Sequence, residues 1–146
     1  MTKDNEIYTG NDLQRIIEFV TPTGINPQDF VLTTLEPQEH YRIEGKPCNG
    51  ETDINKDPMQ VCIYVPKNMR LPLYAGRFKF KLNTRREVQV YSLAHELYHV
   101  WQVKCDFYTF LFGRRLGLID DESEETADKY SITKLTDWRK ISSQRR

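Results

Sequence analysis

The spacing of hydrophobic residues near the start of the chain predicts an amphipathic helix. Asn11 is the predicted N-cap, and the proline- and glycine-containing turn signal at residues 21–24 predicts where the helix ends. The hydrophobic positions that share one face of this helix are Leu13, Ile16, Ile17 and Val20. Because such a face has to be covered, the helix is expected to pack against a core.

Four short stretches with the composition of β-strands come next. They cover residues 30–35, 40–43, 60–66 and 77–82. Residues 47–58 contain prolines and an Asn-Gly pair, so they predict turn and loop. The chain has no internal repeat and no low-complexity segment. The pattern predicts a small, curved, mostly antiparallel sheet of three or four strands.

Two longer helices are predicted in the second half of the chain. Thr84 and Glu87 have the spacing of a capping box, which starts the first of these helices. Its core-facing positions are Val90, Leu93, Leu97 and either Val100 or Trp101. The second helix begins within the acidic segment 120–128, and its core-facing positions are Ala127, Ser131, Leu135 and Trp138. The elements together predict an α+β fold.

Length and charge indicate one small domain with no general attraction for polyanions. With 146 residues, 38% of them hydrophobic, the chain can bury one core, which we assign to residues 1–138. The formal net charge is zero, so neither nucleic acid nor an anionic membrane is an expected partner. Residues 139–146 form a short basic tail, and a frayed end is a better interpretation of it than a nucleic-acid-binding arm.

Cysteine usage and the absence of targeting signals predict a cytoplasmic protein. Cys48, Cys62 and Cys105 are odd in number and lack CxxC spacing, so neither a disulfide framework nor a zinc ribbon is expected. The N-terminus does not have the pattern of a signal peptide, and the most apolar stretch, residues 107–112, is far too short to span a membrane. The oligomeric state is left open.

The motif that carries candidate chemistry is HExxH at residues 95–99, inside the first long helix. Two histidines spaced i and i+4 lie about 40° apart around a helix axis and about 6 Å apart along it, so His95 and His99 can bind one metal ion. Zinc is expected, because imidazole suits it and catalytic zinc sites combine three protein ligands with water. Glu96 is placed to act as a general base. The flanking residues are uncharged, which predicts a helix buried on both sides.

A third ligand has to come from outside this motif. The remaining histidine, His40, lies far upstream in a predicted strand. The HExxHxxGxxH signature is excluded, because Gln102 occupies its glycine position and Cys105 its third histidine position. A Cys105 thiolate could bind zinc, but it leaves the acidic segment unexplained. Within that segment Glu124 lies 25 positions after His99 (124 minus 99).

The combination of HExxH with Glu124-x-x-Ala127-Asp128 resembles the pattern of the gluzincin metallopeptidases. The resemblance covers residues 84 to about 135 and is similar in size and spacing to minimal members such as the ImmA/IrrE-like peptidases. It implies that Glu124 is the third zinc ligand and that Asp128 orients a ligand histidine. The chain differs from the ImmA-like group in having no proline after Leu135. SprT-like proteases fit less well, because their third ligand is a later histidine and none follows His99.

Three glutamates of the acidic segment compete for the third ligand position. Glu124 and Asp128 extend the core-facing stripe of their helix, whereas Glu122 lies on its polar face. Glu125 lies between the two faces and is the reserve candidate. Glu124 also fits a capping role, since it follows Asp121 at the spacing of a capping box. Ligation is favoured because it also gives Asp128 a function.

The resemblance implies a zinc-dependent metallopeptidase that acts on a peptide or protein. Zinc would polarise the scissile carbonyl and activate water, with Glu96 as the proton carrier. It also implies a peptide-binding edge strand beside the metal helix, for which residues 77–81 are the candidate. The alternation in this segment is equally explained by a structural edge strand whose lysines prevent aggregation. Tyr74, Tyr91 and Tyr108 are candidate transition-state donors.

Two other classes of function remain open at this stage. The first is a non-enzymatic regulatory or interaction module stabilised by zinc, which would not need a glutamate at position 96 and would close the fourth coordination position with protein. The second, less favoured, is a DNA-associated protein guided by the basic tail, which would bind in a salt-dependent manner.

Overall fold

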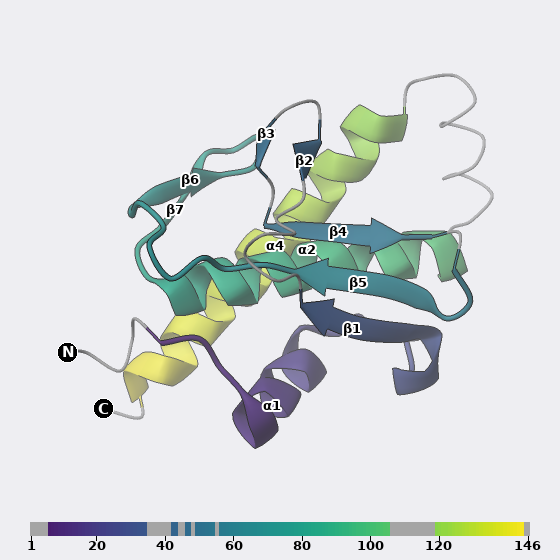
Figure 1. Ribbon diagram of the computed structural model, residues 1–146, viewed down its shortest axis with the longest axis horizontal. Coiled ribbons are helices and arrows are strands. Elements are labelled where there is room, and N and C mark those ends of the chain that lie inside the picture. The colour runs from purple at the N-terminus through teal and green to yellow at the C-terminus, as the bar shows by residue number, and fades with distance from the viewer. Residues whose placement is uncertain are drawn as a thin grey trace.

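The structure is a computed structural model that describes residues 6–34, 42–43, 46–47, 49–54, 56–105 and 119–144. Two long helices, α2 (Arg85–Cys105) and α4 (Ile119–Gln144), pack along each other, and α2 lies between α4 and a small sheet. Figure 1 shows the sheet in front of these helices and α1 (Gly10–Val20) beside it. The predicted α+β class is therefore confirmed, with an N-terminal helix, a small sheet and two later helices.

The main sheet has three strands in the order β1-β5-β4. The central strand β5 (Met59–Ile63) pairs in parallel with β1 (Phe30–Thr34) and antiparallel with β4 (Gly50–Asp53). Two further antiparallel ladders join β2 (Arg42–Ile43) to β3 (Lys46–Pro47) and β6 (Leu73–Ala75) to β7 (Phe80–Leu82). The three-stranded sheet is thus mixed, with one parallel and one antiparallel pairing, whereas both two-stranded ladders are antiparallel. The parallel β1–β5 pair is possible because the intervening chain crosses back before β5. A short 3-10 helix, η2 (Pro27–Asp29), leads into β1.

Several strand predictions need correction. Strand β5 ends at Ile63 and not at residue 66, and β6 was not predicted. Residues 47–58, predicted as loop, contain β4, whose residues lack an alternating hydrophobic pattern and are held as a strand by pairing with β5. Residues 77–79, predicted as strand, form the turn after β6, where Gly76 and Lys79 have positive φ angles of 69° and 49°. His40 and its part of the predicted strand 40–43 lie outside the described residues.

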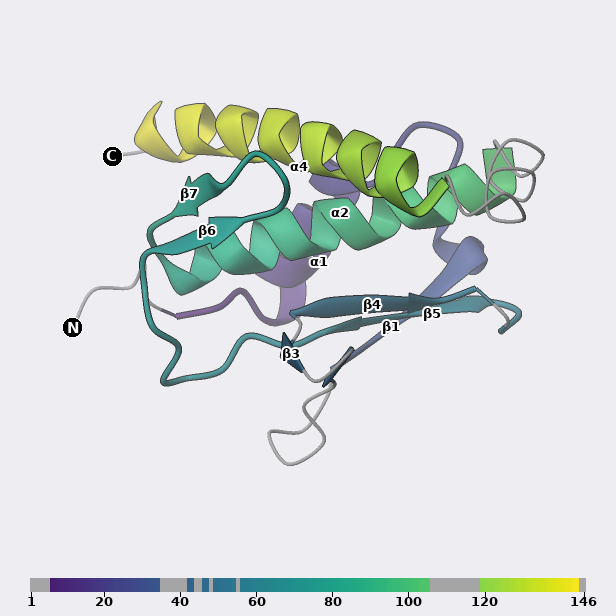
Figure 2. The same cartoon turned by 90° about the horizontal axis from the view of Figure 1, so that it is seen from above.

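Helix α2 is buried on both faces, as its uncharged sequence predicted. One side packs on the sheet and the other on α4 (Figure 2). The predicted core stripe is confirmed at Val90, Leu93, Leu97 and Val100, none of which is more than 1% exposed. On α4 the predicted stripe is also confirmed, since Ala127, Ser131 and Leu135 are fully buried. The centre of the protein is therefore the α2–α4 contact.

The start of α2 is capped as predicted. The Glu87 N–H donates to Thr84 Oγ1 at 3.2 Å, and the Glu87 carboxylate accepts from the Asn83 N–H at 2.8 Å, one residue before the expected partner. Arg139 on α4 also binds the Glu87 carboxylate at 2.7 Å. This contact holds α4 in place beyond Trp138, so residues 139–144 continue the helix instead of forming the predicted frayed tail.

The N-terminal segment is fastened to α2 by a buried amide. Gln89 accepts from the Tyr8 N–H at 2.7 Å and donates to the Tyr8 carbonyl at 3.0 Å, and only 5% of its surface is exposed. Helix α1 then begins at Gly10, one residue before the predicted N-cap Asn11, because Thr9 takes the N-cap position. Among the described residues, no helix combines the length and the apolar character needed to cross a membrane.

Candidate metal centre

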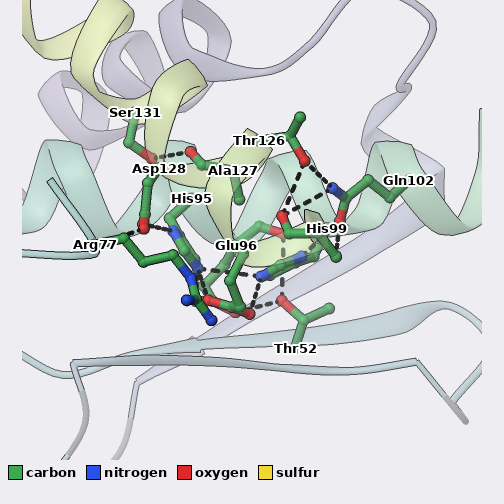
Figure 3. Close-up of polar contacts among 12 residues, drawn as sticks. Thr52, Arg77, His95, Glu96, His99, Gln102, Thr126, Ala127, Asp128 and Ser131 are labelled. Atoms are coloured by element: carbon green, nitrogen blue, oxygen red, sulfur yellow. Dashed lines mark hydrogen bonds and ion pairs between the residues drawn. The ribbon is translucent and has the colours of Figure 1, made fainter. Parts of the chain in front are cut away.

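Three side chains from α2 and α4 bring their donor atoms together at one point. The Nε2 atoms of His95 and His99 lie 3.1 Å apart. The two carboxylate oxygens of Glu124 lie 2.9 Å from His95 Nε2 and 2.9 Å from His99 Nε2. Figure 3 shows the imidazoles of α2 facing each other beneath α4. The sequence predicted these three residues, and the structure brings all of them together.

The geometry of this cluster suits zinc. With Zn–N bonds of about 2.0–2.1 Å in a tetrahedron, donor atoms lie about 3.3 Å from one another. The separations of 2.9 to 3.1 Å between the donors of His95, His99 and Glu124 are close to that value. Two imidazoles and one carboxylate are also a donor set that catalytic zinc sites use. The residues present therefore fit the ion.

The other candidate ligands do not join the cluster. The Glu125 carboxylate lies 3.5 Å from Lys129 Nζ and pairs with that residue one helical turn further along α4. Cys105 lies at the end of α2 and is exposed. Among the described residues, His95, His99 and Glu124 form the single group with metal-binding geometry. His40 and the side chain of Glu122 lie outside the described part of the chain.

Asp128 supports His95 from α4, in the position that the sequence suggested. Its Oδ1 lies 3.0 Å from His95 Nδ1 but off the direction of the ring N–H, so the contact is an ion pair and not a well-aligned hydrogen bond. Asp128 also accepts from the Tyr91 hydroxyl at 3.1 Å and from the Arg77 N–H at 2.9 Å. Gly76 makes this approach possible, because a Cβ there would lie 2.7 Å from the Asp128 carboxylate. Asp128 therefore ties the β6–β7 turn to a candidate zinc ligand.

Gln102 supports His99, and sequence reasoning missed this role. His99 Nδ1 lies 2.7 Å from Gln102 Oε1, one helical turn further along α2, and Gln102 is 6% exposed. The spacing i and i+3 from a ligand histidine is a signal that the sequence offered. In the sequence, Gln102 was interpreted only as the residue that excludes the HExxHxxGxxH signature.

Glu96 is buried beside the cluster and is held by β4. Its Oε1 accepts from Thr52 Oγ1 at 2.8 Å, and its Oε2 lies 3.9 Å from His95 Nε2. A Cβ at Gly50 would lie 2.9 Å from Glu96 Cγ, so only glycine lets β4 pass this close. Thr52 and Gly50 could not be found from the sequence, because their segment was predicted to be loop. The contacts orient the Glu96 carboxylate.

The electrostatics of the cluster favour a cation at its centre. Burial alone would lower the pKa of His95, but Asp128 and Glu124 outweigh it and raise that pKa to about 10. The pKa of His99 is raised by Glu124 despite its burial. Burial would raise the pKa of Glu124, but the two histidines hold it well below its usual range. In the metal-free protein the carboxylates thus stabilise positive charge on the imidazoles, and a divalent cation would replace those protons.

A cavity of about 820 Å³ opens onto the cluster. One wall is the start of β4, with Asn49 and Gly50, and the opposite wall is the segment 73–77. Of the candidate tyrosines, Tyr74 lines this cavity with an exposed ring, whereas the Tyr91 hydroxyl is committed to Asp128. Tyr108 lies outside the described residues. The cavity gives an extended ligand access to Glu96 and the donor cluster.

Comparisons of the chain with protein-family models, with curated proteins and with solved structures find no match. A functional interpretation therefore depends on the residues of the site and their geometry.

Separate substitutions should rank the acidic residues of α4 by their part in zinc binding. Glu124→Ala removes a donor and should lose most of the zinc affinity. Asp128→Ala removes the carboxylate beside His95 and should lose about ten- to a hundredfold. Glu125→Ala should change little, because Glu125 pairs with Lys129. Competition with a chelator of known affinity measures these effects, and a larger loss in Glu125→Ala than in Glu124→Ala would assign the ligand to Glu125.

Proposed function

We propose that the protein is a zinc-dependent metallopeptidase of the gluzincin type. The observation that carries the proposal is the position of Glu96, a buried carboxylate 3.9 Å from His95 Nε2 that also lines the cavity. Zinc held by His95, His99 and Glu124 would supply Lewis acidity for the scissile carbonyl and the attacking water. Hydrolysis by an activated water needs a proton acceptor at this position, and the Glu96 carboxylate can serve as one.

The hydrogen bonds of Glu96 suit a general base. Thr52 donates to Oε1, which holds the carboxylate in one orientation, and Oε2 is the oxygen on the side of His95. Glu96 takes the proton of the attacking water and delivers it to the nitrogen that leaves when the C–N bond breaks. Glu96 thus carries one proton from the attacking water to the leaving nitrogen within the cavity that it lines.

The open fourth side of the cluster favours an enzyme over a zinc site used for folding alone. A structural zinc site is normally closed by a fourth protein ligand. In the described part of the chain the donor group has three members, and the cavity lies next to it. A fourth position left for water and substrate is the arrangement of catalytic zinc sites.

The peptide substrate would lie in the cavity between β4 and the turn that follows β6. Strand β4 is at the edge of the three-stranded sheet and next to α2, whereas the predicted edge segment 77–81 begins as a turn. An extended peptide beside an edge strand can bind through main-chain hydrogen bonds. From the opposite wall, the Arg77 side chain extends towards His95 and Glu96 (Figure 3), where a guanidinium can stabilise the charge that develops on the carbonyl oxygen.

Removal and return of zinc test the proposal directly. The zinc-loaded protein should cleave members of a mixed-sequence peptide library, with the products identified by mass spectrometry. Dialysis against a chelator should abolish cleavage, and one equivalent of zinc should restore it, because the ion supplies both carbonyl polarisation and water activation. Stoichiometric zinc without any cleavage would contradict the enzymatic proposal and favour the zinc-stabilised module.

A further inference from the structure

A buried amide joins the two helices that carry the candidate zinc ligands. Gln102 on α2 contacts His99 Nδ1 at 2.7 Å, and its Oε1 also accepts from the Ser123 hydroxyl at 2.8 Å. Its Nε2 donates to the Ser123 carbonyl at 3.1 Å and to Thr126 Oγ1 at 3.2 Å. Figure 3 shows Gln102 between His99 and Thr126. All four hydrogen-bonding positions of this amide are therefore used.

The Ser123 carbonyl decides which way the amide is turned. A main-chain carbonyl can only accept a hydrogen bond, so the Gln102 atom beside it has to be the NH₂ group. The oxygen of the amide then has to be the atom that faces His99. The reverse orientation would place oxygen against oxygen at Ser123 and NH₂ against a ring N–H at His99. The contact to α4 therefore fixes the acceptor presented to the imidazole.

This acceptor selects one tautomer of His99. An amide oxygen accepts a hydrogen bond from the Nδ1–H group, so a neutral His99 carries its hydrogen on Nδ1 and leaves the Nε2 lone pair available. His99 Nε2 is the atom that faces His95 and Glu124. His95 Nδ1 instead lies 3.0 Å from a carboxylate, that of Asp128, in an ion-pair contact, whereas His99 Nδ1 is hydrogen-bonded to a neutral amide.

The same amide restrains the segment that carries the third ligand. Its two partners on α4, Ser123 and Thr126, lie on either side of Glu124. We propose that Gln102 is a positioning residue, which presents His99 Nε2 to zinc in one tautomer and holds the Glu124 segment of α4 in register with α2. This inference rests on the zinc centre proposed above.

The test compares two buried glutamines of the same helix. Gln102→Met should lower zinc affinity by about ten- to a hundredfold, the usual effect of removing a group that orients a ligand. Gln89→Met removes an equally buried amide that binds only the main chain of Tyr8, so zinc affinity should stay within about twofold of the wild-type value. Chelator competition gives both affinities, and thermal unfolding with the chelator present shows how each variant folds without metal.

Two measurements separate positioning from simple packing. In the zinc-loaded wild-type protein, NMR should show the His99 Nδ1 hydrogen protected from exchange with water by its hydrogen bond to Gln102, and Gln102→Met should lose this protection. Gln102→Glu keeps an oxygen at Nδ1 and should recover most of the lost affinity, although it no longer donates to the Ser123 carbonyl. Packing alone would predict no such recovery, because an additional carboxylate is buried less favourably than methionine.

Several outcomes would overturn the inference. A folded Gln102→Met variant with wild-type zinc affinity would refute it while leaving the zinc centre intact. If Gln102→Met does not fold, the zinc-loaded wild-type protein decides: slow exchange of the His99 Nδ1 hydrogen with water supports the inference, and free exchange refutes it. Failure of the wild-type protein to bind zinc would refute the centre and this inference together.

Discussion

Glu96→Gln should lower the rate of peptide hydrolysis at least about a hundredfold while zinc stays bound, the scale expected when a general base is lost. The amide is nearly the same size as the carboxylate and can still accept from Thr52 Oγ1, so the local structure should be kept. It cannot take up a proton from water. The measurement is kcat/KM on one cleaved peptide, together with the zinc content of the purified variant.

A matched control shows that the effect belongs to this position. Glu125→Gln removes one negative charge from α4 near the cluster, but Glu125 pairs with Lys129 and its side chain is about half exposed. Its kcat/KM should stay within about twofold of the wild-type value, because exposed ion pairs contribute little. Unchanged hydrolysis in a zinc-loaded Glu96→Gln variant would exclude Glu96 as the base and require a different mechanism.

His95→Ala and His99→Ala should each abolish stoichiometric zinc binding and the stabilisation that zinc provides. Two remaining donors cannot complete the site. A ligand that binds only the folded protein stabilises it by about 2.7 kcal/mol when its free concentration is about 100 times Kd. The readout is the difference in Tm with and without zinc, because His95→Ala also removes the partner of Asp128 and so affects the metal-free protein.

The third histidine of the chain supplies the control for these variants. His40→Ala should keep full zinc occupancy and the full zinc-dependent shift in Tm, since His95, His99 and Glu124 already supply three donors. Full zinc occupancy in both His95→Ala and His99→Ala would place the metal elsewhere. Loss of zinc in His40→Ala alone would instead make that residue a ligand.

The part of the site that the sequence predicts is encoded by spacing along helices. His95 and His99 are one turn apart on α2, and the stripe that includes Ala127 and Ser131 orients Glu124 and Asp128 on α4. Helical periodicity is a local property, so it can be read before the fold is known. The same reason explains why the buried stripe of α2 was correctly predicted.

The part that the sequence does not predict consists of contacts between distant segments. Thr52 binds Glu96 across 44 positions, and Gln102 binds Ser123 across 21. Strand β4 itself has no hydrophobic alternation, and it is a strand because β5 and α2 lie beside it. Such contacts depend on neighbours that only the folded chain supplies, which is why they could not be predicted from the linear pattern.

The division of the site between α2 and α4 also sets an order of events during synthesis. His95 and His99 are made before Glu124 and Asp128, and at about 5–20 residues per second the chain between them takes roughly one to five seconds. During this interval a growing chain has two imidazoles but neither the third donor nor the carboxylate beside His95. It can offer zinc only a weak, incomplete site. If the protein is the proposed peptidase, its hydrolytic capacity arises only after α4 has been made and has docked, which would keep an unfinished chain from cutting itself or its neighbours on the ribosome.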